Sequence, residues 1–166
     1  GFYTIDRSNL SDSGTLLSLI LMLIGGSPGS TAGGLKTTTI AVVVIAVFAM
    51  AKGGDDINTF KRRIVSDVVK QSAVIILIYL FAVMLSSMII CSVEGLGMSQ
   101  VLFETASAAG TVGVSKGITN QISAISKIIL MIMMYGGRIG GLSLVHEFGQ
   151  RKPEAPVKRP TELILI

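Results

Sequence analysis

The sequence predicts an all-α membrane protein, and three observations support this class. Half of its 166 residues are hydrophobic and only 14% are charged, whereas a soluble domain carries about 25% charged residues. The segment Gln71–Val93 contains no charged residue and would reach roughly 35 Å as a helix, which is enough to cross a bilayer. Two other apolar regions, residues 13–50 and 122–148, are interrupted by glycines and isolated charges. We therefore expect three membrane-spanning segments in contact with lipid.

The distribution of basic residues predicts the orientation of these segments. Lysine and arginine gather in the connection after the first span and in the C-terminal tail, whereas the connection after Val93 is nearly free of them. Because positive residues favour the cytoplasmic side, we expect both basic regions inside and the C-terminus in the cytoplasm. The chain also opens in mid-pattern with Gly1 and not with Met, so we expect the C-terminal part of a longer protein. The basic residues are Lys52, Lys61, Arg62, Arg63, Arg151, Lys152, Lys158 and Arg159.

The first apolar region is predicted to be a broken helix. Its first half, Thr15–Ile24, is too short to cross a bilayer, and both halves as one straight helix would reach about 55–60 Å, which is too long. The stretch Gly25–Gly34, "GGSPGSTAGG", must therefore form a loop at membrane depth. Pro28 blocks continuation of the helix. The hydroxyl groups of Ser27, Ser30 and Thr31 are expected to satisfy backbone groups that the break exposes.

This stretch has two other possible interpretations, a phosphate-binding loop and a plain linker. A phosphate-binding P-loop requires lysine directly after its second glycine, but here Leu35 follows Gly34 and Lys36 comes one residue late. A linker between two short apolar helices is the plainer alternative. We favour a discontinuous helix beside a permeation path, as in transporters with broken helices. Lys36 either reaches toward the cytoplasmic side or contacts the loop.

The segment between the second and third spans is predicted to dip into the membrane and return. Ser99 is a candidate N-cap for a short helix over Gln100–Ala109, and Gly110 should end it. The C-terminus of such a helix favours a cation. Gly113 can adopt the positive φ that turns successive carbonyls to one side, and "TVG" at Thr111–Gly113 matches the start of the potassium-channel filter TVGYG. The alternative is an extracellular loop with a surface helix.

Arg138 is the candidate functional residue of the third span. It lies roughly 16 Å along the helix from Lys127, hence near mid-membrane, where an arginine is costly and often functional. A structural ion pair with Glu104 is the alternative. We expect Lys127 to reach outward, and Gly136, Gly137, Gly140 and Gly141 to serve helix packing.

Three segments together resemble the KtrB/TrkH family of potassium-uptake proteins, with KtrB closer. They are "LMLIGGSPGSTAGGLKTTT", "FETASAAGTVGVSKGIT" and "MMYGGRIGGLSL". The resemblance implies a fold of four consecutive units, each a span, a re-entrant pore loop and a second span. Residues 1–51 would then be the end of the third unit and residues 70–148 the whole fourth. Gly141 stands where the family more often has proline.

The resemblance also implies boundaries within the chain. The loop 25–34 would interrupt the second span of the third unit, and residues 52–69 would form a cytoplasmic connection. In the fourth unit, a span at 70–93, a pore helix and filter at 99–115 and a span at 121–148 would precede a cytoplasmic tail at 149–166. The implied filter residues, which bind potassium through backbone oxygens, are Gly1, Thr111, Val112, Gly113 and Val114. The implied gate consists of Gly25, Gly26, Ser27, Pro28, Gly29, Ser30, Thr31, Ala32, Gly33, Gly34, Lys36 and Arg138.

The function implied by the resemblance is potassium uptake across a bacterial cell membrane, with sodium dependence. The family pattern further implies a homodimer and a cytosolic ring of nucleotide-binding regulatory subunits. An alternating-access carrier for a small solute is the alternative. We expect no nucleic-acid partner and no bound cofactor, and no carboxylate dyad, metal cluster or nucleophile indicates an enzyme.

Overall fold

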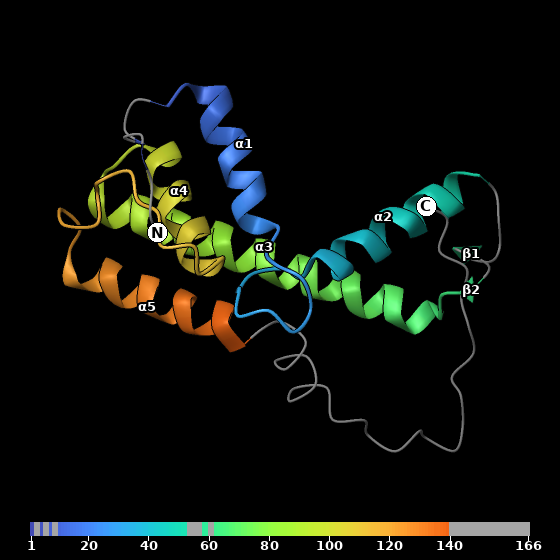
Figure 1. Ribbon diagram of the computed structural model, residues 1–166. Coiled ribbons are helices and arrows are strands. Elements are labelled where there is room, and N and C mark those ends of the chain that lie inside the picture. The colour runs from blue at the N-terminus through green and yellow to red at the C-terminus, as the bar shows by residue number, and fades with distance from the viewer. Residues whose placement is uncertain (2–3, 5–6, 8–9, 53–57, 60–61, 140–166) are drawn as a thin grey trace, which may run out of the picture.

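The computed structural model describes residues 1, 4, 7, 10–52, 58–59 and 62–139. Within them lie five helices and one pair of two-residue strands (Figure 1). The elements are α1 (Asp12–Leu23), α2 (Thr37–Ala51), β1 (Asn58–Thr59), β2 (Arg62–Arg63), α3 (Ser66–Glu94), α4 (Met98–Ala109) and α5 (Ala124–Ile139). The predicted end of the third span, residues 140–148, and the predicted tail, residues 149–166, lie outside the described residues.

Helix α3 is the central element, and α2, α4 and α5 all pack against it. In Figure 1, α2 accompanies its first part, whereas α4 and α5 lie beside its second part. Among the described helices it alone is long and apolar enough to cross a bilayer by itself, with 28% of its most apolar window buried in protein. It begins at Ser66, four residues before the predicted start at 70, and the negative charge of Asp67 in its first turn interacts favourably with the helix dipole. Gly95, with φ of 65°, is the C-cap residue that ends it.

The first apolar region is interrupted between α1 and α2. Helix α1 ends at Leu23 and α2 begins at Thr37, so the residues between them leave the helical path. Ser11 caps α1 by accepting a hydrogen bond from the Gly14 backbone N–H. Helix α1 packs against α4, whereas α2 packs against α3, so the two halves serve different neighbours.

A short helix follows α3, and the N-cap predicted for it was wrong. Helix α4 begins at Met98 with Gly97 as its N-cap residue, so Ser99 lies inside the first turn. The Gly97 carbonyl already accepts from the N–H groups of Gln100 and Val101, which starts the helix two residues earlier than a Ser99 cap would. Nearly the whole of α4 from Val101 onward is buried, because α1, α3 and α5 surround it.

Helix α5 begins later than predicted, at Ala124 and not at residue 121. Glu94, the last residue of α3, fixes this start. Its carboxylate accepts hydrogen bonds from the backbone N–H and hydroxyl of Ser123 and from the Ser126 hydroxyl. The start of α5 is therefore tied to the end of α3, and both helices pack against α4.

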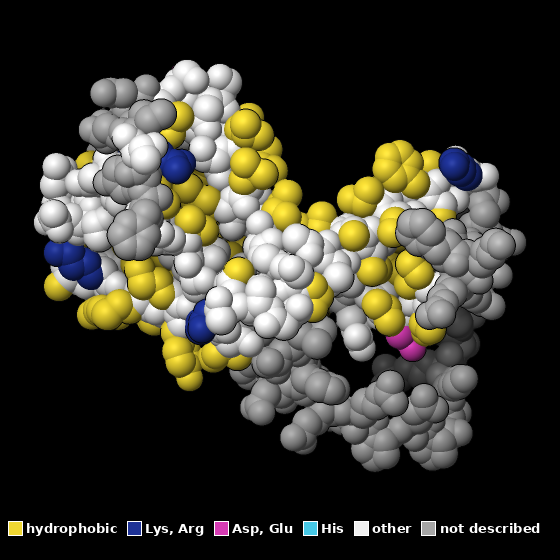
Figure 2. All heavy atoms as spheres, in the orientation of Figure 1, with side chains coloured by type: hydrophobic (Ala, Val, Ile, Leu, Met, Phe, Trp, Pro, Cys, Tyr) yellow, Lys and Arg dark blue, Asp and Glu magenta, His cyan; other side chains and the backbone are white. Residues whose placement is uncertain are grey.

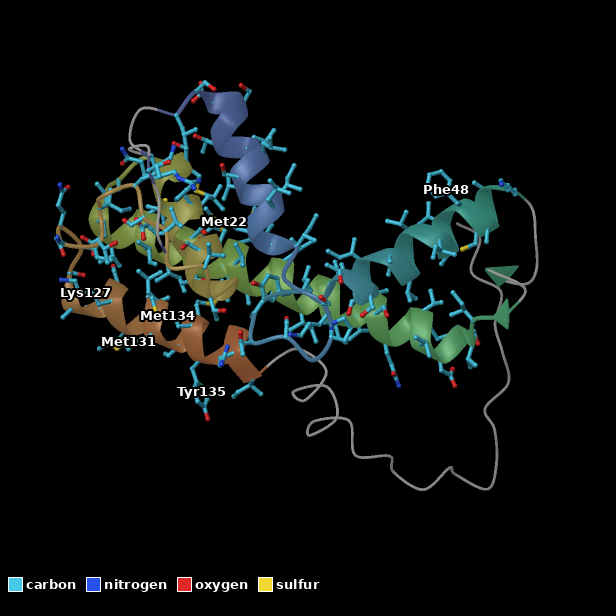
Figure 3. The ribbon with its side chains drawn as sticks, in the orientation of Figure 1. Met22, Phe48, Lys127, Met131, Met134 and Tyr135 are labelled. Carbon is cyan, nitrogen blue, oxygen red and sulfur yellow. The ribbon has the colours of Figure 1, made fainter. Side chains whose placement is uncertain are left out.

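The outer surface of the helices is apolar. Figure 2 shows hydrophobic side chains gathered over the visible sides of α1, α2 and α5. In Figure 3, Phe48 on α2 and Tyr135 on α5 point away from the other helices, and each is mostly exposed. Such a continuous apolar exterior is unusual for a soluble protein and suits contact with lipid or with further protein in a membrane.

Candidate ion pathway and gating loop

The segment after α4 has the irregular backbone predicted from Gly113. Gly113 has φ of 79°, and Thr111 also has a positive φ, of 53°. Ser107 on α4 fixes the segment twice, because its carbonyl accepts from Val112 N–H and its hydroxyl accepts from Val114 N–H, each at 2.9 Å. Val114 is buried, whereas Gly113 is exposed.

Gly1 lies directly against Gly113, although the two are 112 positions apart in the sequence. A Cβ atom added at Gly1 would lie 2.9 Å from the Gly113 carbonyl oxygen, and one added at Gly113 would lie 3.6 Å from the Gly1 Cα. The two glycines that the resemblance assigns to neighbouring filter strands are therefore adjacent in space. Their backbones approach without intervening side chains.

A buried carboxylate holds the chain that leaves this segment. Glu104 on α4 is only 7% exposed and accepts hydrogen bonds from the Ser115 hydroxyl, the Lys116 N–H at 3.1 Å and the Thr119 hydroxyl at 3.2 Å. The Lys116 ammonium donates to the Thr15 hydroxyl of α1 at 2.9 Å and lies 5.4 Å from the centre of the Phe103 ring. These contacts join α1, α4 and the chain beyond Val114.

Sequence reasoning missed the roles of Glu104 and Ser107. They are three residues apart on α4, which places both side chains on one helix face. A carboxylate and a hydroxyl at this spacing in the buried part of the helix were the available signal. A cavity of about 340 Å³ lies on this face, and its lining includes Glu104, Ser107, Thr111 and, from α5, Met134.

The predicted loop at 25–34 is a compact excursion with paired ends. Gly25 N–H donates to the Leu35 carbonyl at 2.7 Å, and Leu35 N–H donates to the Leu23 carbonyl at 3.3 Å. The ends of α1 and α2 are therefore hydrogen-bonded to one another. The expectation for Ser27, Ser30 and Thr31 was wrong, since none of their hydroxyls makes a hydrogen bond to a described residue. Backbone pairing and a hydroxyl from the filter segment satisfy the loop instead.

The far side of the loop is docked against the start of the filter segment and the end of α5. Gly33 N–H donates to the Thr111 hydroxyl at 2.9 Å, and Gly34 N–H donates to the Gly137 carbonyl at 3.3 Å. A Cβ added at Gly34 would lie 3.3 Å from both the Gly110 Cα and the Tyr79 hydroxyl oxygen. The Tyr79 hydroxyl is buried and has no hydrogen-bond partner among the described residues. The glycines here permit close backbone packing.

Two basic side chains hold consecutive carbonyls of the loop. Arg138 on α5 donates to the Thr31 carbonyl, and Lys36 donates to the Ala32 carbonyl at 2.7 Å. Of the two options for Lys36, contact with the loop is therefore observed. Glu104 is not the partner of Arg138, because its carboxylate is occupied by Ser115, Lys116 and Thr119.

Comparison with known proteins places these features in one family. The chain matches the TrkH family, described as cation transport protein, over residues 1–157. Ktr system potassium uptake protein D of Bacillus subtilis is 37% identical over the whole chain, which covers 37% of that relative. Potassium/sodium uptake protein NtpJ of Enterococcus hirae is 36% identical over the whole chain, which covers 38% of it. Ktr system potassium uptake protein B of Vibrio alginolyticus is 31% identical over 99% of the chain, which covers 36% of it.

The chain thus spans little more than a third of the length of the curated relatives it matches. Those relatives are bacterial, and the family consists of cation transporters, so the apolar exterior of α2, α3 and α5 is that of a membrane protein. The chain belongs to the TrkH family of cation transport proteins.

Proposed function

We propose that this chain contributes two of four filter strands and the gate of a potassium-uptake pore. The contact between Gly1 and Gly113 carries the proposal, since it brings the backbone of Gly1 against that of Gly113, which has a positive φ. Backbone carbonyls in a filter replace the hydration shell of potassium. The names of relatives, which refer to potassium uptake and to potassium/sodium uptake, support potassium as the transported ion. We further expect that uptake depends on sodium.

In this proposal, residues 1–51 end the third unit of the pore and residues 70–148 form the fourth. The connection at 52–69 and the tail at 149–166 lie in the cytoplasm of a multi-pass protein in the cell membrane. The "Ktr system" names of relatives support a multicomponent assembly. We expect a homodimer on a cytosolic ring of nucleotide-binding regulatory subunits.

The loop 25–34, with Lys36 and Arg138, serves as the gate. It is held to Thr111 at the inner end of the filter segment, so a permeating ion leaving the filter would meet it next. Its glycines Gly33 and Gly34 contact Thr111, Gly110 and Gly137 without a side chain of their own to be unpacked. A positive charge at Arg138 beside the loop raises an electrostatic barrier to cations in the closed state.

The test is uptake of potassium and sodium by the full-length transporter carrying Gly113→Ser. The control is Gly117→Ser, because Gly117 has a comparable positive φ of 87° but no neighbouring atoms at its Cβ position. Backbone strain is thus matched in the two variants, and proximity to Gly1 is not. A filter predicts that Gly113→Ser loses the preference for potassium over sodium while Gly117→Ser keeps it. Equal preferences in both variants would favour the alternating-access carrier.

A further inference from the structure

Thr111 has the most unusual backbone conformation in the described part of the chain. With φ of 53°, it is the non-glycine residue with positive φ there. A β-branched side chain rarely adopts this region, because its Cβ substituents crowd the backbone. Such a conformation persists where surrounding contacts determine it, and it tends to occur at functional sites.

Contacts from both α4 and the loop hold Thr111, since its N–H donates to the Ala108 carbonyl at 3.1 Å. Its hydroxyl accepts the Gly33 N–H at 2.9 Å, from a residue 78 positions earlier. A Cβ atom at Gly33 would lie 2.6 Å from Thr111 Cγ2 on one side and 2.9 Å from the Gly137 carbonyl oxygen on the other. The side chain of Thr111 therefore packs against the loop. Its backbone, which directly follows Gly110, belongs to the proposed filter segment.

We propose that Thr111 is a positioning residue that couples the loop to the filter, an inference that rests on the proposed function. With the loop docked, the Gly33 N–H holds Thr111 in the left-handed region. When the loop moves away, this hydrogen bond is lost and Thr111 returns to an ordinary conformation. Rotation about its ψ turns the peptide plane that joins it to Val112, which includes the Thr111 carbonyl and the Val112 N–H that donates to the Ser107 carbonyl. Opening the gate thereby changes the oxygen lattice that binds the ion.

Coupling between two sites is reciprocal, so an ion in the filter must also affect the loop. The test is hydrogen–deuterium exchange of the loop, residues 25–36, in the purified full-length transporter with either potassium or sodium. We compare the wild type with Thr111→Ser, which keeps the hydroxyl, and Thr111→Val, which keeps the branched shape. Residues 37–51 of α2 serve as an internal control, and the potassium-dependent rise in melting temperature reports ion binding in each sample.

Coupling through the hydroxyl predicts that potassium slows loop exchange by about fivefold or more in the wild type and in Thr111→Ser, the lower end of typical coupling factors. In Thr111→Val the slowing should disappear. The same slowing in Thr111→Val, or none in a wild type that potassium stabilises, would overturn the proposal and leave the filter assignment intact. If potassium neither stabilises the wild type nor slows exchange, the filter assignment fails and the coupling fails with it.

A second variant perturbs the same contact from the loop while residue 111 stays threonine. In Gly33→Ala, the added Cβ would lie too close to the Thr111 side chain for the present contact to persist. We expect it to raise the potassium concentration needed for half-maximal stabilisation by about fivefold or more, whereas Gly136→Ala, which has open space at its Cβ position, should not. If Gly33→Ala and the wild type need the same potassium concentration for half-maximal stabilisation, the proposed coupling is overturned.

Discussion

Gly137 lies so close to the carbonyl oxygen of Ala109 that a Cβ atom at Gly137 would overlap with it. This contact presses α5 onto the last turn of the pore helix α4. The carbonyl of the same Gly137 accepts the N–H of Gly34 from the loop. One residue without a side chain therefore joins three elements: α4, α5 and the loop 25–34.

Gly137→Ala should destabilise the transporter, whereas Gly136→Ala should not. In an exposed helix, replacing glycine by alanine gains up to about 1 kcal/mol, but overpacking against a fixed backbone costs about 1–3 kcal/mol. The overlap with Ala109 makes the second effect dominant at Gly137, while Gly136 has no atom near its Cβ position. Thermal unfolding of the full-length protein in detergent measures both. Equal melting temperatures would show that α5 does not pack on α4 in this way.

Glu104→Gln should weaken the ion preference of the pore. The carboxylate accepts from Ser115, Lys116 and Thr119, and an amide nitrogen in place of one oxygen cannot accept. A buried group left unsatisfied costs about 1–3 kcal/mol, which frees the chain beyond Val114 to shift. Competition between potassium and sodium in an uptake assay measures the preference. Ser92→Ala, which removes an exposed hydroxyl on α3, is the control. An unchanged preference in Glu104→Gln would limit Glu104 to a role in stability.

Arg138→Gln should raise potassium flux, and Arg138→Lys should raise it less. The guanidinium donates to the Thr31 carbonyl and places a positive charge beside the loop. A hydrogen bond from a charged donor contributes about 1.5–3 kcal/mol. If this bond stabilises only the closed state, its loss should raise the population of the open state about tenfold. Lysine keeps the charge but loses the forked geometry. Rubidium uptake into cells checks this. Unchanged uptake by a correctly folded Arg138→Gln variant would argue against an electrostatic gate.

The helices were predictable because their signals are local. The charge-free stretch at Gln71–Val93 dictates α3, and the glycines and Pro28 dictate the break between α1 and α2. The start of α4 was less predictable, because Gly97 starts the helix through its carbonyl without a side-chain cap. The start of α5 depends on Glu94, which is distant in sequence, so no local pattern around residue 121 could reveal it.

The site was predicted in its parts but not in its connections. Gly113 requires a positive φ that its sequence context indicates, and the loop is recognisable from its composition. The partner of the loop was not predictable, because the Gly33 N–H meets the hydroxyl of Thr111, far along the chain, in place of the nearby Ser30. Long-range contacts of this kind depend on how α4 and α5 pack, and no spacing within the loop encodes them.

Removal of residues 27–33 should speed potassium entry if the loop obstructs the path. The excised residues carry the contacts with Thr111 and Arg138, whereas the pairing of Gly25 with Leu35 lies outside them and can still hold α1 beside α2. If the loop only fills space, its removal should leave a cavity in the protein and a less stable assembly. The measurement is initial potassium uptake, normalised to the amount of intact transporter found by size-exclusion chromatography. Slower entry with intact assembly would mean that the loop supports the filter and does not close it, because without the Gly33 N–H the Thr111 backbone loses the contact that fixes its conformation.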